Sequence, residues 1–321
     1  MLARYAARRL LWVLPVIVGA SVLAFVIMHA APGSPWSREG RQLPPALVER
    51  LTEELHLDDP LPVQYLVWLQ NMLSGNMGLT TTTHPDPVGP IILEAAVPSI
   101  QLGLMAFSLA LVVGVGLGMV AALRDRHWQG YLATGVAVLG MAAPAFALAA
   151  LLQLFWPTAP QQRPGGPFSA PSAPGGWEEA RQWILPVISL AALPMAMIAR
   201  HTKGAMLEVL HSDYVRTAHS KGLSEQRIAT HHLFRNGLVP LVTIIGPLLA
   251  VLITGSVVVE RVFQIPGLGL LYWGAIRARD FGLLMGITVI YAAAIAIINA
   301  LVDIGYGWID PRIRLTGTND G

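Results

Sequence analysis

Hydrophobic residues in this chain fall into long, nearly uninterrupted runs rather than into the alternating or one-faced patterns of soluble elements. A helix that crosses the hydrocarbon core of a bilayer needs roughly 20 mostly apolar residues. Six stretches meet this requirement, at residues 10–31, 97–123, 131–156, 183–199, 238–259 and 281–304. The pattern therefore predicts an all-α polytopic membrane protein with six transmembrane helices.

The first run follows Arg4, Arg8 and Arg9, a basic start that a secretory signal peptide and a membrane anchor share. Its apolar stretch is longer than the core of a signal peptide. No small-x-small cleavage site follows it cleanly, because the chain continues with prolines and a glycine at residues 32–35. The sequence favours a retained anchor over a cleaved signal.

Composition supports a membrane protein and excludes several classes of chemistry. Hydrophobic residues make up 54% of the chain and charged residues only 12%, whereas soluble domains carry about 25% charged residues. The net charge of +2 is too small to suggest nucleic-acid binding. The chain has no cysteine, which excludes disulfides, thiolate metal sites and cysteine nucleophiles. No G-x-x-x-x-G-K-[ST] phosphate loop occurs, so we expect no ATPase activity in this chain.

The distribution of basic residues predicts the orientation. With the N-terminus in the cytoplasm, 13 of the 21 lysines and arginines fall on the cytoplasmic side and 8 on the outer side. Cytoplasmic segments normally hold the excess of positive charge. We therefore expect both termini in the cytoplasm.

The first outer loop contains two predicted amphipathic helices. In the first, Leu47, Leu51 and Leu55 recur every four residues. The second covers residues 62–73, where Tyr65 and Trp68 suit a membrane–water interface. Both helices can lie on the outer bilayer surface, which we favour, or form a docking platform for an external partner. The proline- and glycine-rich segment 157–176 predicts no regular element and carries no assigned chemistry.

Polar residues within the predicted spans are candidates to line a translocation pathway, because contact with lipid is unfavourable for them. The candidates are Gln153, Thr254, Ser256 and Asn299. The alternative for each hydroxyl is a hydrogen bond to its own helix backbone. Asp303 near the inner end of the last span is expected to pair with a cytoplasmic arginine in a structural role.

Small residues within the spans predict close helix packing. Gly114, Gly116 and Gly118 superficially resemble a nucleotide-binding glycine run, but they lie in an apolar span without a βαβ unit. Close approach of a second helix explains them better. Pro144 lies within the third predicted span and is expected to kink it.

The segment between the fourth and fifth spans, residues 200–238, is basic and helical in pattern. Residues 204–220 can form one helix, Gly222 ends it, and Ser224 can cap a second helix through Arg235. The pattern predicts a helix–turn–helix elbow on the cytoplasmic side. Charge alone would also fit a solvated loop that only fixes the topology.

This elbow resembles the EAA loop of ABC-importer permeases, and more narrowly that of the dipeptide/oligopeptide/nickel family of binding-protein-dependent permeases. The resemblance is carried by Asp213-Tyr214-Val215-Arg216-Thr217-Ala218, Lys221-Gly222-Leu223, Arg235-Asn236 and Pro240. Further matches follow in order along nearly the whole chain, at residues 29–33, 57–65, 258–260, 265–269 and 310–312, with Phe263, Asn299 and Asp303. Arg216 stands where the general pattern opens with glutamate, so an acidic contact is not carried over.

The resemblance implies a type I importer permease fold and the first, B-type, permease of its system, in the bacterial inner membrane. Such a permease translocates peptides, or related solutes such as nickel chelates, with energy from separate ATPase subunits. Its implied partners are a second homologous permease, two ABC ATPases and an extracytoplasmic solute-binding protein; no cofactor or metal is implied. The coupling residues would be Asp213, Tyr214, Arg216, Thr217, Ala218, Lys221, Gly222, Leu223 and Ser224.

The expected organisation is an N-terminal tail with the first span (1–31), an external loop (32–96), a permease domain (97–314) that contains the coupling loop (200–238), and a C-terminal tail (315–321). The alternative function is an ion-gradient-driven secondary transporter. That class shows inverted repeats and carboxylates near the middle of the bilayer. Glu260 and Asp303 lie near the ends of predicted spans instead.

Overall fold

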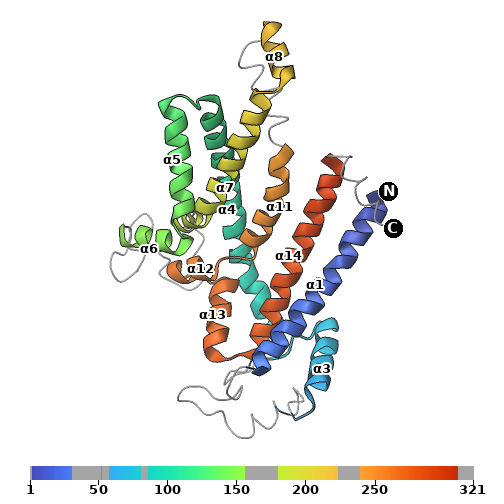
Figure 1. Cartoon of the computed structure of the whole chain (residues 1–321). Helices are drawn as coiled ribbons and strands as arrows, with labels where there is room; N and C mark the ends of the chain where they lie inside the picture. The colour runs from blue at the N-terminus through green and yellow to red at the C-terminus, as the bar shows by residue number, and fades with distance from the viewer. Residues whose placement is uncertain are drawn as a thin grey trace.

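A computed structural model describes residues 2–30, 52, 58–80, 86–155, 180–222 and 239–309. The regular elements in these ranges are helices, apart from one β-bridge between Leu79 and Pro87. The helices form an elongated bundle (Figure 1). Several predicted segments lie outside the described residues: the amphipathic helix around residues 47–55, the loop 157–176, residues 223–238 and the C-terminal tail.

Four helices are long and apolar enough to cross a bilayer. They are α1 (Leu2–Ala30), α4 (Val88–Leu123), α7 (Ile184–Leu210) and α14 (Phe281–Ile309). They confirm the first, second, fourth and sixth predicted spans. Helix α4 begins at Val88, well before the predicted start at residue 97, so part of the predicted external loop belongs to this helix.

The third and fifth predicted spans are each a bent pair of helices rather than one straight helix. Helices α5 (Trp128–Ala142) and α6 (Ala145–Phe155) meet at 99°, and α11 (Val239–Ile253) and α12 (Val257–Phe263) meet at 47°. Pro144 explains the first bend, because proline forces the preceding Ala143 into an extended conformation, with φ −92° and ψ 115°. Counting each pair as one span gives up to six spans.

Helices α4 and α7 approach each other closely at the predicted glycines. A Cβ atom on Gly114 would lie 2.7 Å from the carbonyl oxygen of Met195, and one on Gly118 would overlap the side chain of Thr202. Gly116 faces open space. Close helix packing therefore explains two of the three glycines.

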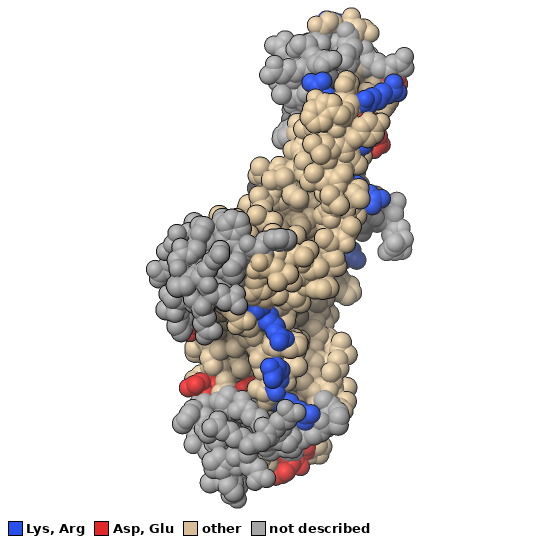
Figure 2. Space-filling model, turned by 90° about the vertical axis from the view of Figure 1, so that its left-hand side faces the viewer, with Lys and Arg blue, Asp and Glu red and all other residues tan. Residues whose placement is uncertain are grey.

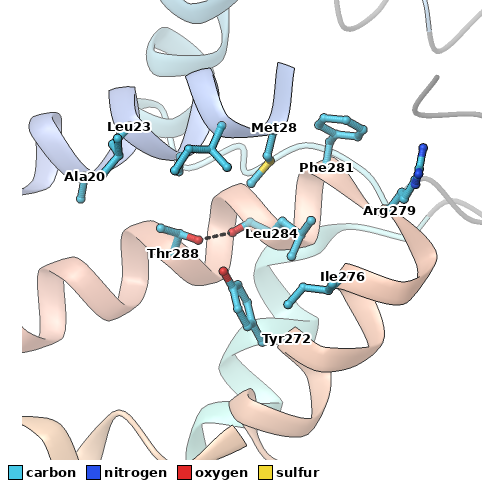
Figure 3. A pocket seen from close by; sticks show the side chains of 11 residues that line it. Ala20, Leu23, Met28, Tyr272, Ile276, Arg279, Phe281, Leu284 and Thr288 are labelled. Atoms are coloured by element: carbon cyan, nitrogen blue, oxygen red, sulfur yellow. Dashed lines mark hydrogen bonds between the residues drawn. The ribbon is translucent and has the colours of Figure 1, made fainter. Parts of the chain in front are cut away.

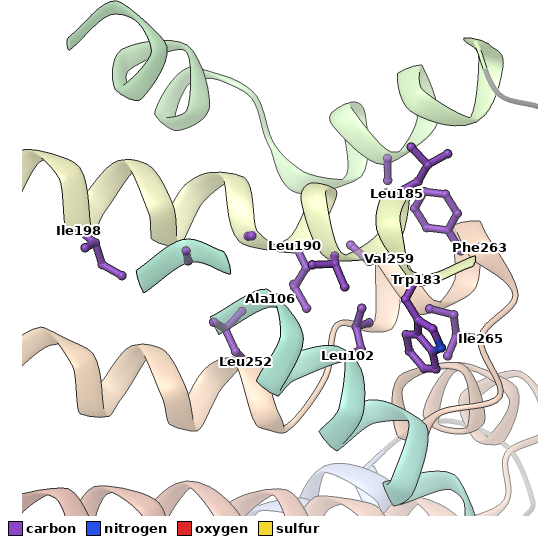
Figure 4. Close-up of a cluster of buried hydrophobic side chains, with 14 residues drawn as sticks. Leu102, Ala106, Trp183, Leu185, Leu190, Ile198, Leu252, Val259, Phe263 and Ile265 are labelled. Atoms are coloured by element: carbon purple, nitrogen blue, oxygen red, sulfur yellow. The ribbon is translucent and has the colours of Figure 1, made fainter. Parts of the chain in front are cut away.

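A cluster of buried hydrophobic side chains joins α4 and α7 to α12 (Figure 4). Leu102 and Ala106 come from α4, Trp183 from the short 3₁₀ helix η1 (Ala180–Trp183) that precedes α7, and Phe263 from α12. We call this group the α12 cluster; its other members are Ala110, Ala149, Leu185, Val187, Leu190, Ala191, Ile198, Leu252, Val259 and Ile265. The cluster fixes the short α12 against the long helices.

Helix α1 packs along α14. At one end the Arg9 guanidinium lies 2.9 Å from the Asp303 carboxylate, which confirms the arginine partner expected for this aspartate. At the other end α1 meets α3 (Leu61–Leu73), where the Tyr65 hydroxyl and Ser21 Oγ are 2.8 Å apart. Helix α3 confirms the second predicted amphipathic helix.

Candidate functional site

Helix α8 (Asp213–Ser220) projects beyond the end of the bundle as a short continuation of α7 (Figure 1). Helix α7 ends with the His211 N–H donating to the Leu207 carbonyl at 3.2 Å, and α8 begins with the Val215 N–H donating to the Ser212 carbonyl at 3.2 Å. Only two residues separate the helices. Motion of α8 therefore reaches α7 through a very short connection.

Helix α8 has one buried position and several exposed ones. Val215 is buried, with 1% of its surface exposed, whereas Asp213, Thr217, Ser220 and Lys221 are exposed. Of the other predicted coupling residues, Tyr214, Arg216 and Ala218 belong to the α8 backbone, while Leu223 and Ser224 lie outside the described residues. The structure thus places three of the predicted polar coupling residues, Asp213, Thr217 and Lys221, at exposed positions on this helix and its C-terminal turn.

Gly222 ends this segment in the left-handed conformation, with φ +73°. Just before it, the Lys221 N–H donates to the Thr217 carbonyl at 3.1 Å. No atom of the residues that the structure describes lies within 4 Å of a Cβ added at Gly222. A side chain here is therefore disfavoured by the backbone conformation, by roughly 1–2 kcal/mol, rather than by contact with another described residue.

A second group of polar contacts surrounds Glu260 of α12, next to the α12 cluster. Its side chain is fully buried. Oε1 accepts a hydrogen bond from Ser99 Oγ of α4 at 2.9 Å. Oε2 accepts hydrogen bonds from the N–H groups of Gly269 and Leu270 at 2.7 and 3.2 Å. The carboxylate is thus paired with three donors from two other helices.

These donors include the first amides of α13 (Leu268–Ala278). The Leu268 N–H donates to Ser99 Oγ at 2.8 Å, so Ser99 and Glu260 together bind the first three amides of the helix. Amides in the first turn have no partner within their own helix, and the helix dipole favours a negative group there. Glu260 and Ser99 therefore hold α12, α4 and the start of α13 together; we call them, with these amides, the Glu260 node.

Glycines make room for the Glu260 node. A Cβ atom on Gly255 would overlap Glu260 Oε1, and one on Gly267 would lie 2.5 Å from both Glu260 Oε2 and Ser99 Oγ. Gly255 also has φ +82°, at the break between α11 and α12. The glycines are needed for close approach, which a residue with a side chain cannot achieve.

The predicted pathway residues gather near the same break. Ser256 caps α12 by accepting a hydrogen bond from the Val259 N–H at 3.3 Å. Thr254 donates to the Val251 carbonyl at 2.9 Å, and Gln153 of α6 donates to the Val262 carbonyl of α12 at 3.0 Å. Asn299 lies in α14 and is partly buried. Two of the four candidates, Ser256 and Gln153, thus help to hold α12, while Thr254 bonds to the backbone of α11.

The role of Ser99 was missed in the sequence, and that of Glu260 was seen only as part of a matching motif. The two residues lie 161 positions apart, so neither spacing nor helical periodicity brings them together. The available signal was the Gly-x-Gly pattern at residues 267–269 shortly after a glutamate in an apolar stretch.

The fold defines a multi-pass α-helical membrane protein. The profile of a family described as "Binding-protein-dependent transport system inner membrane component" matches residues 114–315, and that of its N-terminal region matches residues 1–89. The chain belongs to this family of inner-membrane permeases, which has the type I ABC-importer fold.

Individual relatives match almost end to end. The chain is 38% identical over 314 residues to the dipeptide transport system permease protein of Bacillus subtilis, covering 98% of this chain and 99% of the relative. It is 37% identical over 313 residues to the oligopeptide transport system permease protein of Haemophilus influenzae, covering 97% and 99%. The Escherichia coli K12 oligopeptide permease is 34% identical over 313 residues, with the same coverage.

Proposed function

We propose that this chain is the first permease subunit of an ATP-driven importer for peptides. The names of its relatives support the solute class, and they describe components of multisubunit transport systems. In this proposal two ABC ATPases supply the energy, a second permease completes the pathway and an extracytoplasmic binding protein delivers the solute. Nickel chelates are the alternative solute class, and the uptake assay below distinguishes them from peptides.

The observation that carries the proposal is the accessible helix α8 at the end of an unbroken α7. An ATPase groove that holds α8 would move it as a rigid lever. Two discrete arrangements of the spans then expose the pathway alternately to the two sides of the membrane. Helix α8 lies at the same end of the bundle as the start of α1 and the end of α14 (Figure 1), which supports cytoplasmic termini.

The buried carboxylate Glu260 is the feature that comes closest to a secondary transporter. Ion-driven carriers use such groups as proton or cation sites. Here both oxygens already accept hydrogen bonds, and two of the three donors are amides at a helix start. This arrangement supports a structural acceptor, and therefore the ATP-driven importer.

Gly222→Val tests the coupling role in the reconstituted transporter, with uptake of a labelled dipeptide and of a nickel chelate measured separately. Valine at φ +73° disturbs the turn after α8 through the backbone, without a clash against the described residues. We expect normal membrane insertion, loss of uptake and loss of solute-stimulated ATP hydrolysis. Normal uptake by this variant would refute the proposal.

Gly75→Val is the matched control. Gly75 also has a positive φ of +85° and open space around it, but it follows α3 in the first outer loop. We expect this variant to keep solute-stimulated ATP hydrolysis. Because the chain has no cysteine, Ser220→Cys gives a single label site, which should react from the cytoplasmic side only.

A further inference from the structure

We propose that the groove between α4, α5 and α7 binds an anionic phospholipid, with one acyl chain in the groove and the phosphate at Arg200. The groove has a volume of about 500 Å³, within the range of roughly 300–1,000 Å³ typical of ligand sites. Its floor is built largely from alanines, including Ala121, Ala133, Ala137 and Ala199. Small side chains leave a furrow where larger ones would fill the space.

The groove follows the length of α5. On α5 its lining runs from Ala133 to Ala142, which corresponds to roughly 14 Å at 1.5 Å per residue. Thr134, Arg200 and Lys203 lie at one end, and Met141 and Ala142 at the other. This polarity, basic at one end and apolar along the rest, matches that of a lipid with a charged headgroup.

The basic end lies at the depth of the headgroups. Trp128 and Tyr131 at the start of α5 are 68% and 69% exposed, and such aromatic residues mark the membrane–water interface. Thr134 follows Tyr131 by one helical turn. The middle of one face of the molecule is mostly free of charged residues (Figure 2), as a lipid-facing surface requires.

Two basic residues at this end have different roles. Lys203 Nζ lies 2.7 Å from Asp125 Oδ1 and 3.3 Å from Thr134 Oγ1, so an acidic neighbour already compensates its charge. Arg200 is exposed, and among the residues that the structure describes it forms no ion pair. Basic pockets between helices on the cytoplasmic side attract anionic headgroups. Arg200 is the cation that a phosphate can neutralise.

A second apolar groove differs in this respect. It lies between α1, α13 and α14, has a volume of about 490 Å³ and is lined by Leu23, Met28, Tyr272 and Leu284 among others (Figure 3). Its cation, Arg279, already interacts with another residue. A bare apolar groove accepts any acyl chain, whereas the groove at Arg200 is expected to select for headgroup charge.

The test is native mass spectrometry of the full-length protein, exchanged into micelles that contain equal amounts of phosphatidylglycerol and phosphatidylcholine with the same chains. We expect the wild type to retain phosphatidylglycerol preferentially. Arg200→Gln should reduce this preference about fivefold, the equivalent of ~1 kcal/mol per basic residue near a headgroup. Arg126→Gln removes an exposed arginine on the same side that does not line the groove, and should keep the preference.

A second pair of variants tests the acyl-chain part. Val138 and Leu132 are both 58% exposed on α5, and of the two only Val138 lines the groove. Val138→Trp should reduce retention of both lipids, whereas Leu132→Trp should leave it unchanged. Equal retention in all four variants, or no lipid on the wild type, would overturn the inference.

The alternative to a lipid in this groove is a helix of another subunit. Val138→Cys provides a single thiol in a chain without cysteine, and cross-linking in the assembled transporter then identifies its neighbour. A cross-link to a lipid-linked probe supports the lipid, and a cross-link to another subunit overturns it.

Discussion

Replacing Glu260 by leucine removes the acceptor from the Glu260 node while keeping a side chain of similar size. The amides of Gly269 and Leu270 then lose their partner inside the protein, whereas the Ser99 hydroxyl loses one of its two acceptors and still accepts from the Leu268 N–H. Each buried donor left unpaired costs about 1–3 kcal/mol. Removing one side of a buried charged network costs about 3–5 kcal/mol in total, and we expect that magnitude for Glu260→Leu.

Glu260→Gln separates hydrogen bonding from charge. The amide oxygen of glutamine can still accept from the α13 amides, but neutral hydrogen bonds are weaker than charged ones, so we expect a loss of about 1–2 kcal/mol. Ser99→Ala leaves the Leu268 amide unpaired and removes one donor to Glu260. Its cost should fall between those of the two glutamate variants.

The assay is thermal unfolding in detergent, followed by fluorescence of the 9 tryptophans. At roughly 2–4 °C per kcal/mol for a large domain, Glu260→Leu should lower Tm by about 6–20 °C. Glu208→Gln, an exposed glutamate in α7, is the control and should leave Tm unchanged. A Glu260→Leu protein that melts with this control would refute the view that the carboxylate holds α13.

Two further predictions use the same assay. Gly118→Ala should cost about 1–3 kcal/mol, since its Cβ would overlap Thr202, whereas Gly116→Ala should stabilise the helix by up to ~1 kcal/mol; equal effects would contradict the packing. A hydrogen bond and the charge of Lys203 hold the pKa of Asp125 below its ordinary value of 3.8. The ionised carboxylate therefore contributes stability above about pH 3.8, and this contribution is lost as the pH falls through the lowered pKa. Asp125→Asn should thus be less stable than the wild type at neutral pH, with a difference that disappears in acid; a pH-independent difference would refute the ion pair's role.

The spans were predictable because each depends on composition over about 20 residues, which no distant contact can override. The same holds for the bend at Pro144, where the cause is local. The bend between α11 and α12 was not predicted, because it depends in part on Gly255 approaching Ser99 of α4, a residue from a distant part of the chain. The pairing of Asp303 with an arginine was predicted as a type, but only the fold identifies Arg9 as the partner.

The candidate site divides in the same way. The elbow could be found in the sequence because its motif is contiguous. The expectation of one helix over residues 204–220 was wrong, since α7 ends at Leu210 and α8 begins at Asp213, but the turn lies at Gly222 as predicted. The polar residues chosen for the pathway were selected by hydropathy alone, which cannot separate a residue facing a cavity from one that caps a helix. Ser256 illustrates this, because its hydroxyl accepts the hydrogen bond that begins α12.

Helix α7 connects the two functional regions physically. It runs from Ile184 to Leu210, or about 40 Å at 1.5 Å per residue, and carries α8 at one end. At the other end its first residues and η1 contribute to the α12 cluster, which contains Val259 and lies next to the Glu260 node. Packing against α4 supports its middle, so we expect α7 to move as a rigid rod. In an ATP-driven importer, displacement of α8 would therefore be transmitted along α7 to the start of α13. The hydrogen bonds of the Glu260 node would then decide whether α12 and α13 move together with α7 or separate from it.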